Sequence, residues 1–292
     1  MAARQRLAAV AVVALLASGL TGCDGGGGAP ATPSGSPSTA SAPPPTASPS
    51  AQAKPTDRSP HGVLLSAQLA MQTARRAKVS YRLGADAGSG PLFWQPKTAL
   101  QIKRSTPAEA EQLIVVDTVA YQGGDAATAA RNGGRHWERF TVPPDADGHK
   151  ETPYAGLIDL LSPVEALTAA TAEGTDPVFV GEEKSEDSTT EHYRVTTTAE
   201  KYAAAQTQLT QARRDGLRAA LAPGGSTSLT LDLWLNDKDQ LVRLQRTGSG
   251  DSGRADDSVL YTDLAGALLS AQAPAETDTV DTGVRTVSPL AR

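Results

Sequence analysis

The stretch Leu229-Thr230-Leu231-Asp232-Leu233-Trp234-Leu235-Asn236 places a leucine at every second position. A period of two puts all four leucines on one face of a β-strand. Turn-forming residues follow at 236–239, and residues 241–246 provide a returning strand. We therefore expect a β-hairpin whose leucine face, made of Leu229, Leu231, Leu233 and Leu235, points inward. In the opposite register Trp234 would face inward instead.

Further strands and helices are expected on both sides of this hairpin. Runs rich in β-branched and aromatic residues predict strands at 79–83, 92–103, 111–121, 135–142, 178–182, 189–198 and 258–268. Helical spacing of apolar residues predicts helices at 63–78, 154–161, 163–173 and 199–221. The third helix has a strong start signal in Ser162-Pro163-Val164-Glu165. Segments 84–91 and 248–257 are expected to be turns, and a Thr/Asp-rich tail is expected from Ala273 onward.

The N-terminus predicts export. Arg4 and Arg6 precede a short apolar run at residues 7–16, which is shorter than the ~20 residues that span a bilayer. Such a start is typical of a secretory signal peptide, here residues 1–22. The run ends at Leu20-Thr21-Gly22-Cys23, which resembles the lipobox of bacterial lipoproteins and contains the single cysteine of the chain. The alternative is an ordinary signal peptide with an incidental cysteine.

A lipobox implies that Cys23 carries a diacylglyceryl group after residues 1–22 are removed. Two acyl chains, such as palmitate, hold a protein stably on a membrane, whereas one does so only marginally. Residues 23–60 combine the lipidated cysteine with a segment of Gly, Ala, Pro, Ser and Thr, a composition that predicts a disordered tether. An O-glycosylated stalk is the alternative. The expected location is the extracytoplasmic face of the cell membrane, with a lipid anchor.

The composition narrows the function further. The net charge is −5 and aromatic residues make up 4% of the 292 residues. Because no basic patch alternates with aromatic residues, we expect no nucleic-acid partner. With Cys23 acylated no thiol remains, so the domain is expected to fold without disulfides or cysteine metal ligands. The core is expected to be aliphatic, and no cofactor is expected.

Enzyme motifs are weak or missing in the sequence. Gly250-Asp251-Ser252-Gly253 matches the serine segment of chymotrypsin-like proteases, but that chemistry needs a positioned histidine and aspartate. The four histidines, His61, His136, His149 and His192, lie in unrelated contexts. The acidic residues at 145–148 and near 237 lack the spacing of a calcium loop. We therefore expect no catalytic residues and no metal site, and interpret 250–253 as a solvated loop.

Several short motifs together resemble the LppX/LprAFG lipoproteins, a LolA-like group of actinobacterial exported proteins. The resemblance covers roughly residues 61–282. It is carried by three sets of segments, in the same order and spacing as in the family: Pro163–Leu167 with Val180–Glu183 and Thr190–Val195; Leu233–Asn236 with Leu241–Leu244; and Tyr261–Gly266 with Ala273-Pro274.

This resemblance implies an α+β fold: a strongly curved antiparallel sheet, or half-barrel, with helices packed on its concave face. It also implies a space between sheet and helices that accepts the acyl chains of a lipid or glycolipid. The candidate ligand-binding residues are then Leu229, Leu231, Leu233 and Leu235, or Trp234 in the other register. The leucine face fits a plain packed core equally well. The expected domains are 61–282 and a C-terminal tail at 283–292.

Two functions remain open from the sequence. The first is a membrane-anchored lipoprotein that binds, and possibly transfers, a lipid or glycolipid. The second is a non-catalytic sensor or interaction module with an envelope protein as partner, in which the helix at 199–221 would present the contact surface.

Overall fold

The computed structural model describes residues 57–105, 110–145, 147–184, 188–222, 228–250 and 253–287. All of them belong to one compact unit, Gln52–Arg292. The N-terminal segments predicted as signal peptide, lipidated cysteine and tether lie outside the described residues, except for Asp57 to Pro60. Within the described residues, no helix is long and apolar enough to cross a membrane.

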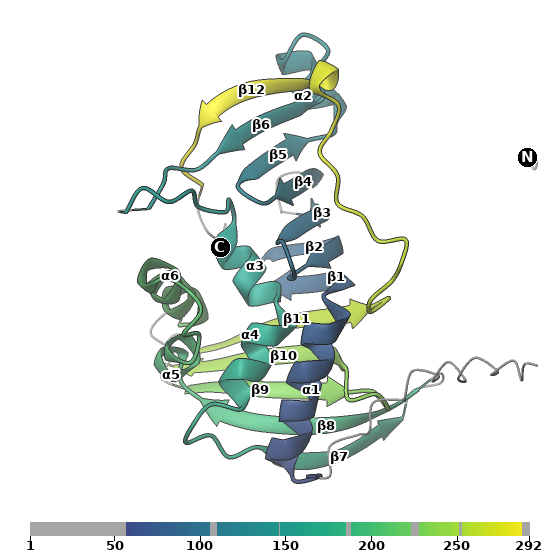
Figure 1. Cartoon of the computed structure of the whole chain (residues 1–292), viewed down its shortest axis with the longest axis vertical. Helices are drawn as coiled ribbons and strands as arrows, with labels where there is room; N and C mark the ends of the chain where they lie inside the picture. Colours follow the sequence, from purple (N-terminus) through teal and green to yellow (C-terminus); the bar gives the residue numbers. More distant parts are fainter. Residues whose placement is uncertain are drawn as a thin grey trace, which may run out of the picture. The chain divides into compact units, whose positions relative to one another are not determined.

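The unit is built on one sheet of twelve strands (Figure 1), in the order β12-β6-β5-β4-β3-β2-β1-β11-β10-β9-β8-β7. Every neighbouring pair is antiparallel except β12 and β6, which are parallel. The strands are β1 (Arg76–Leu83), β2 (Asp86–Phe93), β3 (Ala99–Ser105), β4 (Ala110–Val116), β5 (Val119–Gly123), β6 (Trp137–Thr141), β7 (Val178–Lys184), β8 (Thr189–Thr197), β9 (Ser228–Leu235), β10 (Leu241–Gly250), β11 (Gly253–Thr262) and β12 (Thr279–Val284).

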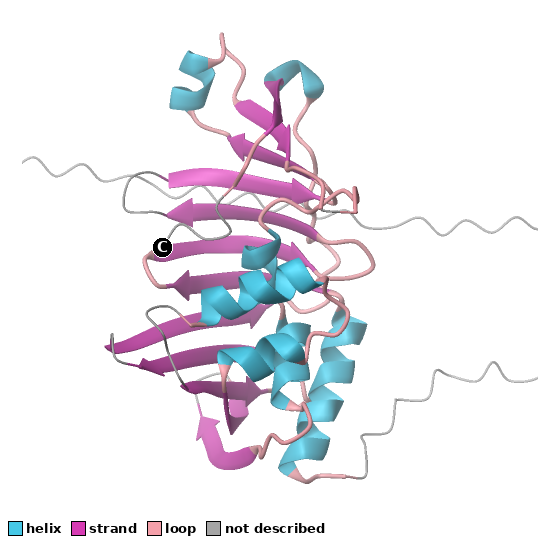
Figure 2. Ribbon diagram, turned by 90° about the vertical axis from the view of Figure 1, so that its left-hand side faces the viewer, coloured by secondary structure: helices cyan, strands magenta, loops and turns pink. Residues whose placement is uncertain are grey.

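The α-helices gather on the concave face of this curved sheet (Figure 2), except for α2, which lies at the β5–β6 end. Their bounds are α1 (Pro60–Ala74), α2 (Ala126–Arg131), α3 (Ala155–Leu161), α4 (Pro163–Ala170), α5 (Ala199–Ala204) and α6 (Gln211–Leu221), and a 3-10 helix covers Glu276–Asp278. The helices lie over the half of the sheet that contains β1 and β7–β11, and α3 reaches toward β2. The predicted α+β fold with helices on a curved sheet is confirmed.

The leucine hairpin forms the centre of the core. β9 pairs with β10 so that Leu233 lies opposite Leu244 and Leu231 lies opposite Arg246. The four predicted leucines are all buried and belong to one core cluster with residues of α1, α3, α4 and α5. Burying an aliphatic side chain of this kind contributes roughly 1.5–3 kcal/mol. The leucines thus face the helices.

Trp234 consequently lies on the opposite, convex face of the sheet. Its ring stacks on the His192 imidazole with centroids 4.3 Å apart. The Arg243 guanidinium lies over the same ring, 4.2 Å from its centroid. His192 Nε2 in turn lies 2.7 Å from a carboxylate oxygen of Asp232. Trp234 is therefore buried by polar neighbours on its own face and makes no part of the helix-covered core.

Several boundaries differ from the sequence predictions. The first helix ends at Ala74, because Arg75 adopts a left-handed conformation and Ala77 already faces inward on β1. Segment 84–91, predicted as a turn, is mostly strand β2. Its glycines are needed for strand packing: a Cβ at Gly90 would lie 2.0 Å from the Gln101 carbonyl oxygen. Run 111–121 divides into β4 and β5 at Asp117, which has a positive φ.

The predicted single helix at 199–221 is two helices. Gln206 interrupts it, since its fully buried side chain donates to the Glu165 carbonyl oxygen at 2.9 Å. The Thr210 hydroxyl then caps α6 by accepting from the Arg213 backbone N–H at 3.3 Å. The segment 248–257 was predicted as a polar turn, but its described residues, 248–250 and 253–257, form the paired ends of β10 and β11, because backbone pairing does not require apolar side chains. Thr279 to Val284 forms strand β12 instead of a tail, and helix α2 was not predicted.

Candidate functional site

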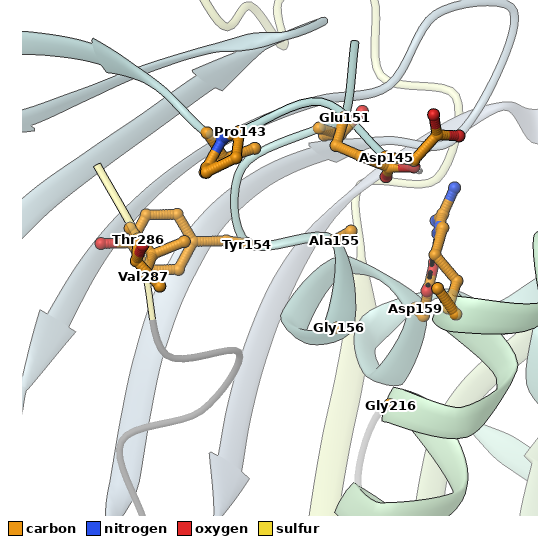
Figure 3. Close-up of a pocket in the computed structure, with 14 residues that line it drawn as sticks. Pro143, Asp145, Glu151, Tyr154, Ala155, Gly156, Asp159, Gly216, Thr286 and Val287 are labelled. Atoms are coloured by element: carbon orange, nitrogen blue, oxygen red, sulfur yellow. Dashed lines mark hydrogen bonds and ion pairs between the residues drawn. The ribbon is translucent and has the colours of Figure 1, made fainter. Parts of the chain in front are cut away.

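A pocket with a mainly apolar lining opens between α3, α6 and two chain segments that leave the sheet (Figure 3). Its volume is about 330 Å³, which lies within the range of ~300–1,000 Å³ for ligand pockets. The apolar part of its wall comes from four places in the sequence: Val142 and Pro143 after β6, Tyr154 to Gly156 at the start of α3, Ala212 and Gly216 on α6, and Val287 after β12. The pocket therefore depends on the tertiary fold.

Small residues and one tyrosine give the pocket its shape. Tyr154 precedes α3 in a left-handed conformation, with φ of 57°. Its ring packs edge-on against Phe140 of β6, with centroids 6.4 Å apart, and this contact fixes the N-terminal end of α3 against the sheet. Ala155 and Gly156 on α3 face Ala212 and Gly216 on α6, so that neither helix fills the space between them. A Cβ added at Gly216 would meet no atom within 4 Å.

One buried ion pair lies at the pocket wall. Asp159 on α3 is 2% exposed and accepts from Arg213 on α6, through Nε at 3.2 Å and through a second bond from Nη2. Burial raises the pKa of Asp159 above its ordinary value, and the Arg213 guanidinium opposes that shift. This bidentate pair links α3 to α6, and such charge-assisted bonds are stronger than neutral ones. Asp145 and Glu151 lie at the same side of the pocket (Figure 3). The rim of the pocket therefore has both negative charges and the positive charge of Arg213, while its wall is apolar.

A ladder of charged and amide side chains crosses the concave face next to the pocket. Arg104 on β3 is 7% exposed and donates to Asp86 at 2.8 Å and to Glu111 at 3.0 Å. Gln122 on β5 donates to Glu111 at 2.7 Å. The Arg104 guanidinium also lies 5.8 Å from the centroid of the Tyr154 ring. The ladder marks where the aliphatic core ends, and Tyr154 connects it to the pocket.

The residues predicted from the sequence lie elsewhere. Cys23 is outside the described residues. Leu229, Leu231, Leu233 and Leu235 are buried in the closed core, and Trp234 is on the convex face. None of these five lines the α3–α6 pocket. The pocket residues were missed because short Ala, Gly and Pro segments carry no periodic signal. The start of the predicted helix at 154–161 was the one usable indication of this region.

Each histidine has a polar partner among the described residues, so none of them is a clear candidate for catalysis. His136 Nδ1 lies 2.8 Å from Asp278, and His149 Nδ1 lies 3.2 Å from Asp145. His61 Nε2 lies 3.3 Å from the Thr171 carbonyl oxygen. Asp145, Asp147 and His149 place one ligand atom each within 4.8 Å of one another, but the Asp145 carboxylate already accepts backbone N–H groups of its own loop. Asp251 and Ser252 of the protease-like match lie outside the described residues.

Comparison with known proteins finds two relatives from Streptomyces. No protein-family model matches the chain. An uncharacterized 31.2 kDa protein of Streptomyces griseus, encoded between rplA and rplJ, is 29% identical over 160 residues, which cover 54% of this chain and 52% of that protein. The chain thus matches about half the length of this relative. A candidate lipoprotein of Streptomyces coelicolor, SCO4650, is 27% identical over 96% of this chain and 95% of its own length.

Among solved structures, lipoprotein LppX of Mycobacterium tuberculosis is similar with a TM-score of 0.47 and 12% identity, over 74% of this chain and 100% of LppX. LprF of Mycobacterium bovis is similar with a TM-score of 0.46 and 16% identity, over 74% of this chain and 97% of LprF.

We predict that Arg213→Met destabilises the fold by about 3 kcal/mol at pH 7, because it leaves the buried Asp159 carboxylate without its cation. The loss should shrink as the pH falls toward 4: the pKa of Asp159 is already raised in the fold, so protonation favours the folded state at low pH. Urea unfolding at both pH values measures this.

Arg218→Met is the matched control. Its ion pairs with Asp215 and Glu200 are long and exposed and should contribute less than about 1 kcal/mol. Equal losses in the two variants, or a loss in Arg213→Met that grows toward pH 4, would contradict the proposed role of the pair.

Proposed function

We propose that this protein is a membrane-anchored lipoprotein of the cell envelope that binds an acyl chain of a lipid or glycolipid in the α3–α6 pocket. The observation that carries the proposal is the pocket itself. It combines an apolar wall of small side chains with a charged rim, as an amphipathic ligand requires. An acyl chain would lie against Pro143, Ala155, Ala212 and Val287. Its polar end would remain near Arg213 and Glu151 at the rim.

The leucine face forms a second part of the proposed site. Leu229, Leu231, Leu233 and Leu235 belong to the core cluster beneath the helices. Arg246, which lies opposite Leu231 on β10, donates to the Leu160 carbonyl oxygen of α3 at 2.8 Å. An acyl chain longer than the pocket reaches this face only if α3 and α4 move away from the sheet. In this proposal, the pocket is the entry and the leucine face is the extension. Binding and release then suffice for transfer, with no catalytic residue and no cofactor.

The proposed anchor is the diacylglyceryl group on Cys23. The lipobox-like sequence supports it, and the name of the Streptomyces coelicolor relative points the same way. The predicted tether was expected to extend to residue 60, but α1 already begins at Pro60 with Ser59 as its N-cap. In the proposal the tether leads from the anchor at Cys23 toward Asp57, where the described part of the chain begins. We therefore place the folded unit at the extracytoplasmic face of an actinobacterial cell membrane. The length of the tether would allow the folded unit to reach other parts of the envelope.

A protein-interaction role has one observation in its favour. β7 is the last strand of the sheet and has a partner on one side only. Val178, Phe179 and Val180 on this strand are 46–55% exposed. An exposed apolar edge strand can pair with a strand of another protein. This reading replaces the predicted contact through a single helix at 199–221, since that helix is divided into α5 and α6.

Cys23→Ala tests the anchor. We expect the full-length variant to move from the membrane fraction to the soluble exported fraction, because both acyl chains are lost. Fractionation of cells that express the two forms, with intact mass measurement of the purified proteins, measures the shift. Ala29→Ser, in the adjoining tether, is the control and should remain in the membrane fraction. A Cys23→Ala variant that stays membrane-bound would contradict the anchor.

Gly216→Phe tests the pocket. The new ring points into open space at the pocket wall, so we expect the fold to be retained and the amount of co-purified lipid to fall at least about fivefold. Native mass spectrometry of full-length protein from the envelope measures this. Gly216→Ala is the matched control: it should retain the lipid and stabilise α6 by up to about 1 kcal/mol.

If the interaction role through β7 holds instead, neither variant at position 216 changes what co-purifies, and no lipid adduct is found with the wild type. Lipid content that is unchanged in Gly216→Phe, with a folded protein, would overturn the placement of the acyl chain. A wild-type protein free of lipid would overturn the proposed function.

A further inference from the structure

A second pocket, different in chemistry from the first, opens between α1, α4 and the segments that follow β2 and α5. Its volume is about 490 Å³. Amides and hydroxyls dominate its lining: Gln68, Gln72, Gln95, Gln208, Thr168 and Thr207. Among the described residues that line it there is no lysine, arginine or histidine, and Glu165 is the single ionisable group. Such a surface suits a neutral ligand with many hydrogen-bonding groups more than an anion or an acyl chain.

Two buried polar atoms in this pocket have no hydrogen-bond partner among the described residues. They are the Ser162 hydroxyl and Oε2 of Glu165. Ser162 is 2% exposed and occupies the N-cap of α4, yet its side chain makes no capping bond. Leaving buried polar groups unpaired is unfavourable, so such groups call for an explanation. Ser162 and Glu165 both line the pocket, so a ligand that enters it lies next to both residues.

Glu165 can act as donor or acceptor here. Burial raises its pKa to about 7, so protonated and ionised forms coexist near neutral pH. A protonated carboxyl donates one hydrogen bond, and both forms accept. A ligand hydroxyl, which also donates and accepts, matches either form. This favours hydroxyl groups over groups that only donate or only accept.

Trp94 supplies the apolar part of the pocket. Its indole N–H donates to the Met71 carbonyl oxygen at 2.9 Å, which fixes the ring between α1 and the segment after β2. The ring is partly buried against the core and also lines the pocket. The amides around it are held in place too: Gln68 donates to Thr168 at 2.9 Å, and Gln208 donates to Gln206 at 3.2 Å. A fixed aromatic ring among fixed amides can pack against the C–H face of a sugar ring while the amides bind its hydroxyls.

We propose that the pocket formed by Trp94, Ser162, Glu165, Thr168 and Gln208 binds a neutral saccharide. The sugar comes either from a free glycan of the envelope or from the headgroup of a glycolipid. This pocket and the apolar pocket share no lining residue, and saccharide binding here does not depend on acyl-chain binding.

The test uses the full-length protein in detergent micelles and three probes: maltotriose, mannotriose and galactotriose. Saturation-transfer NMR and isothermal titration calorimetry measure binding. We expect at least one trisaccharide to bind with a dissociation constant below about 10 mM and to quench tryptophan fluorescence. Gln208→Ala and Gln72→Ala should each weaken this binding about tenfold, as expected for the loss of a hydrogen-bonding side chain. Both residues lie at the accessible side of the pocket, so the fold should be retained.

Gln101→Ala on β3 is the matched control, because its side chain lies on the other face of the sheet from Leu100 and Ile102. It should bind like the wild type. A second arm compares digalactosyldiacylglycerol with diacylglycerol in the same micelles. If the sugar is a headgroup, the glycolipid binds more tightly and Gln208→Ala removes the difference.

The proposal is overturned if none of the trisaccharides binds and the glycolipid shows no advantage over diacylglycerol. It is also overturned if Gln208→Ala and Gln72→Ala bind as well as Gln101→Ala. The acyl-chain proposal is tested separately, since Gly216→Phe should leave trisaccharide binding unchanged and Gln208→Ala should leave the binding of diacylglycerol, which has no sugar headgroup, unchanged.

Discussion

The pairing of β1 with β11 is the constraint on which the rest of the structure depends. β1 (Arg76–Leu83) comes early in the domain and β11 (Gly253–Thr262) comes late, so their pairing joins segments that are far apart in the sequence. On one side, β1 to β6 follow one another through the sheet, and on the other side lie β11 to β7. Val79 lies opposite Tyr261 at the junction, and both are buried. Without this pairing the sheet would consist of two halves, each with one more exposed edge.

The position of the helix layer, and with it the position of both pockets, depends on the β1–β11 pairing. The chain between the two halves contains α3 and α4, and it must cross the concave face to pass from β6 to β7. The Tyr261 hydroxyl on β11 donates to the Leu161 carbonyl oxygen at 2.9 Å, which fixes the end of α3 over the junction. The apolar pocket lies beside α3 and α6, and the amide-lined pocket lies beside α1 and α4.

Much of the fold could be predicted from local patterns, and the sites could not. The alternation of Leu229 to Leu235 and the start signal at Ser162-Pro163 each depend on a few neighbouring residues, so both elements were found. The segment of β2 was wrongly predicted as a turn because of its glycines. Gly90 is required there by the close approach of Gln101 on the next strand, and the local sequence does not show that contact. The break between α5 and α6 depends on the contact of Gln206 with Glu165, 41 residues earlier in the chain. Each pocket takes its wall from four separate segments, so no spacing in the sequence indicates it.

The most direct test of the central claim is photo-cross-linking of the full-length protein with a phospholipid that carries a diazirine at the end of one acyl chain. The claim is that an acyl chain enters between α3 and α6. Peptide mapping should then locate the label on the pocket wall, at Val142, Ala155, Ala212 or Val287, and on the leucine face with a longer chain. Label confined to Val178, Phe179 and Val180 of the exposed edge strand, or no label at all, would contradict the account.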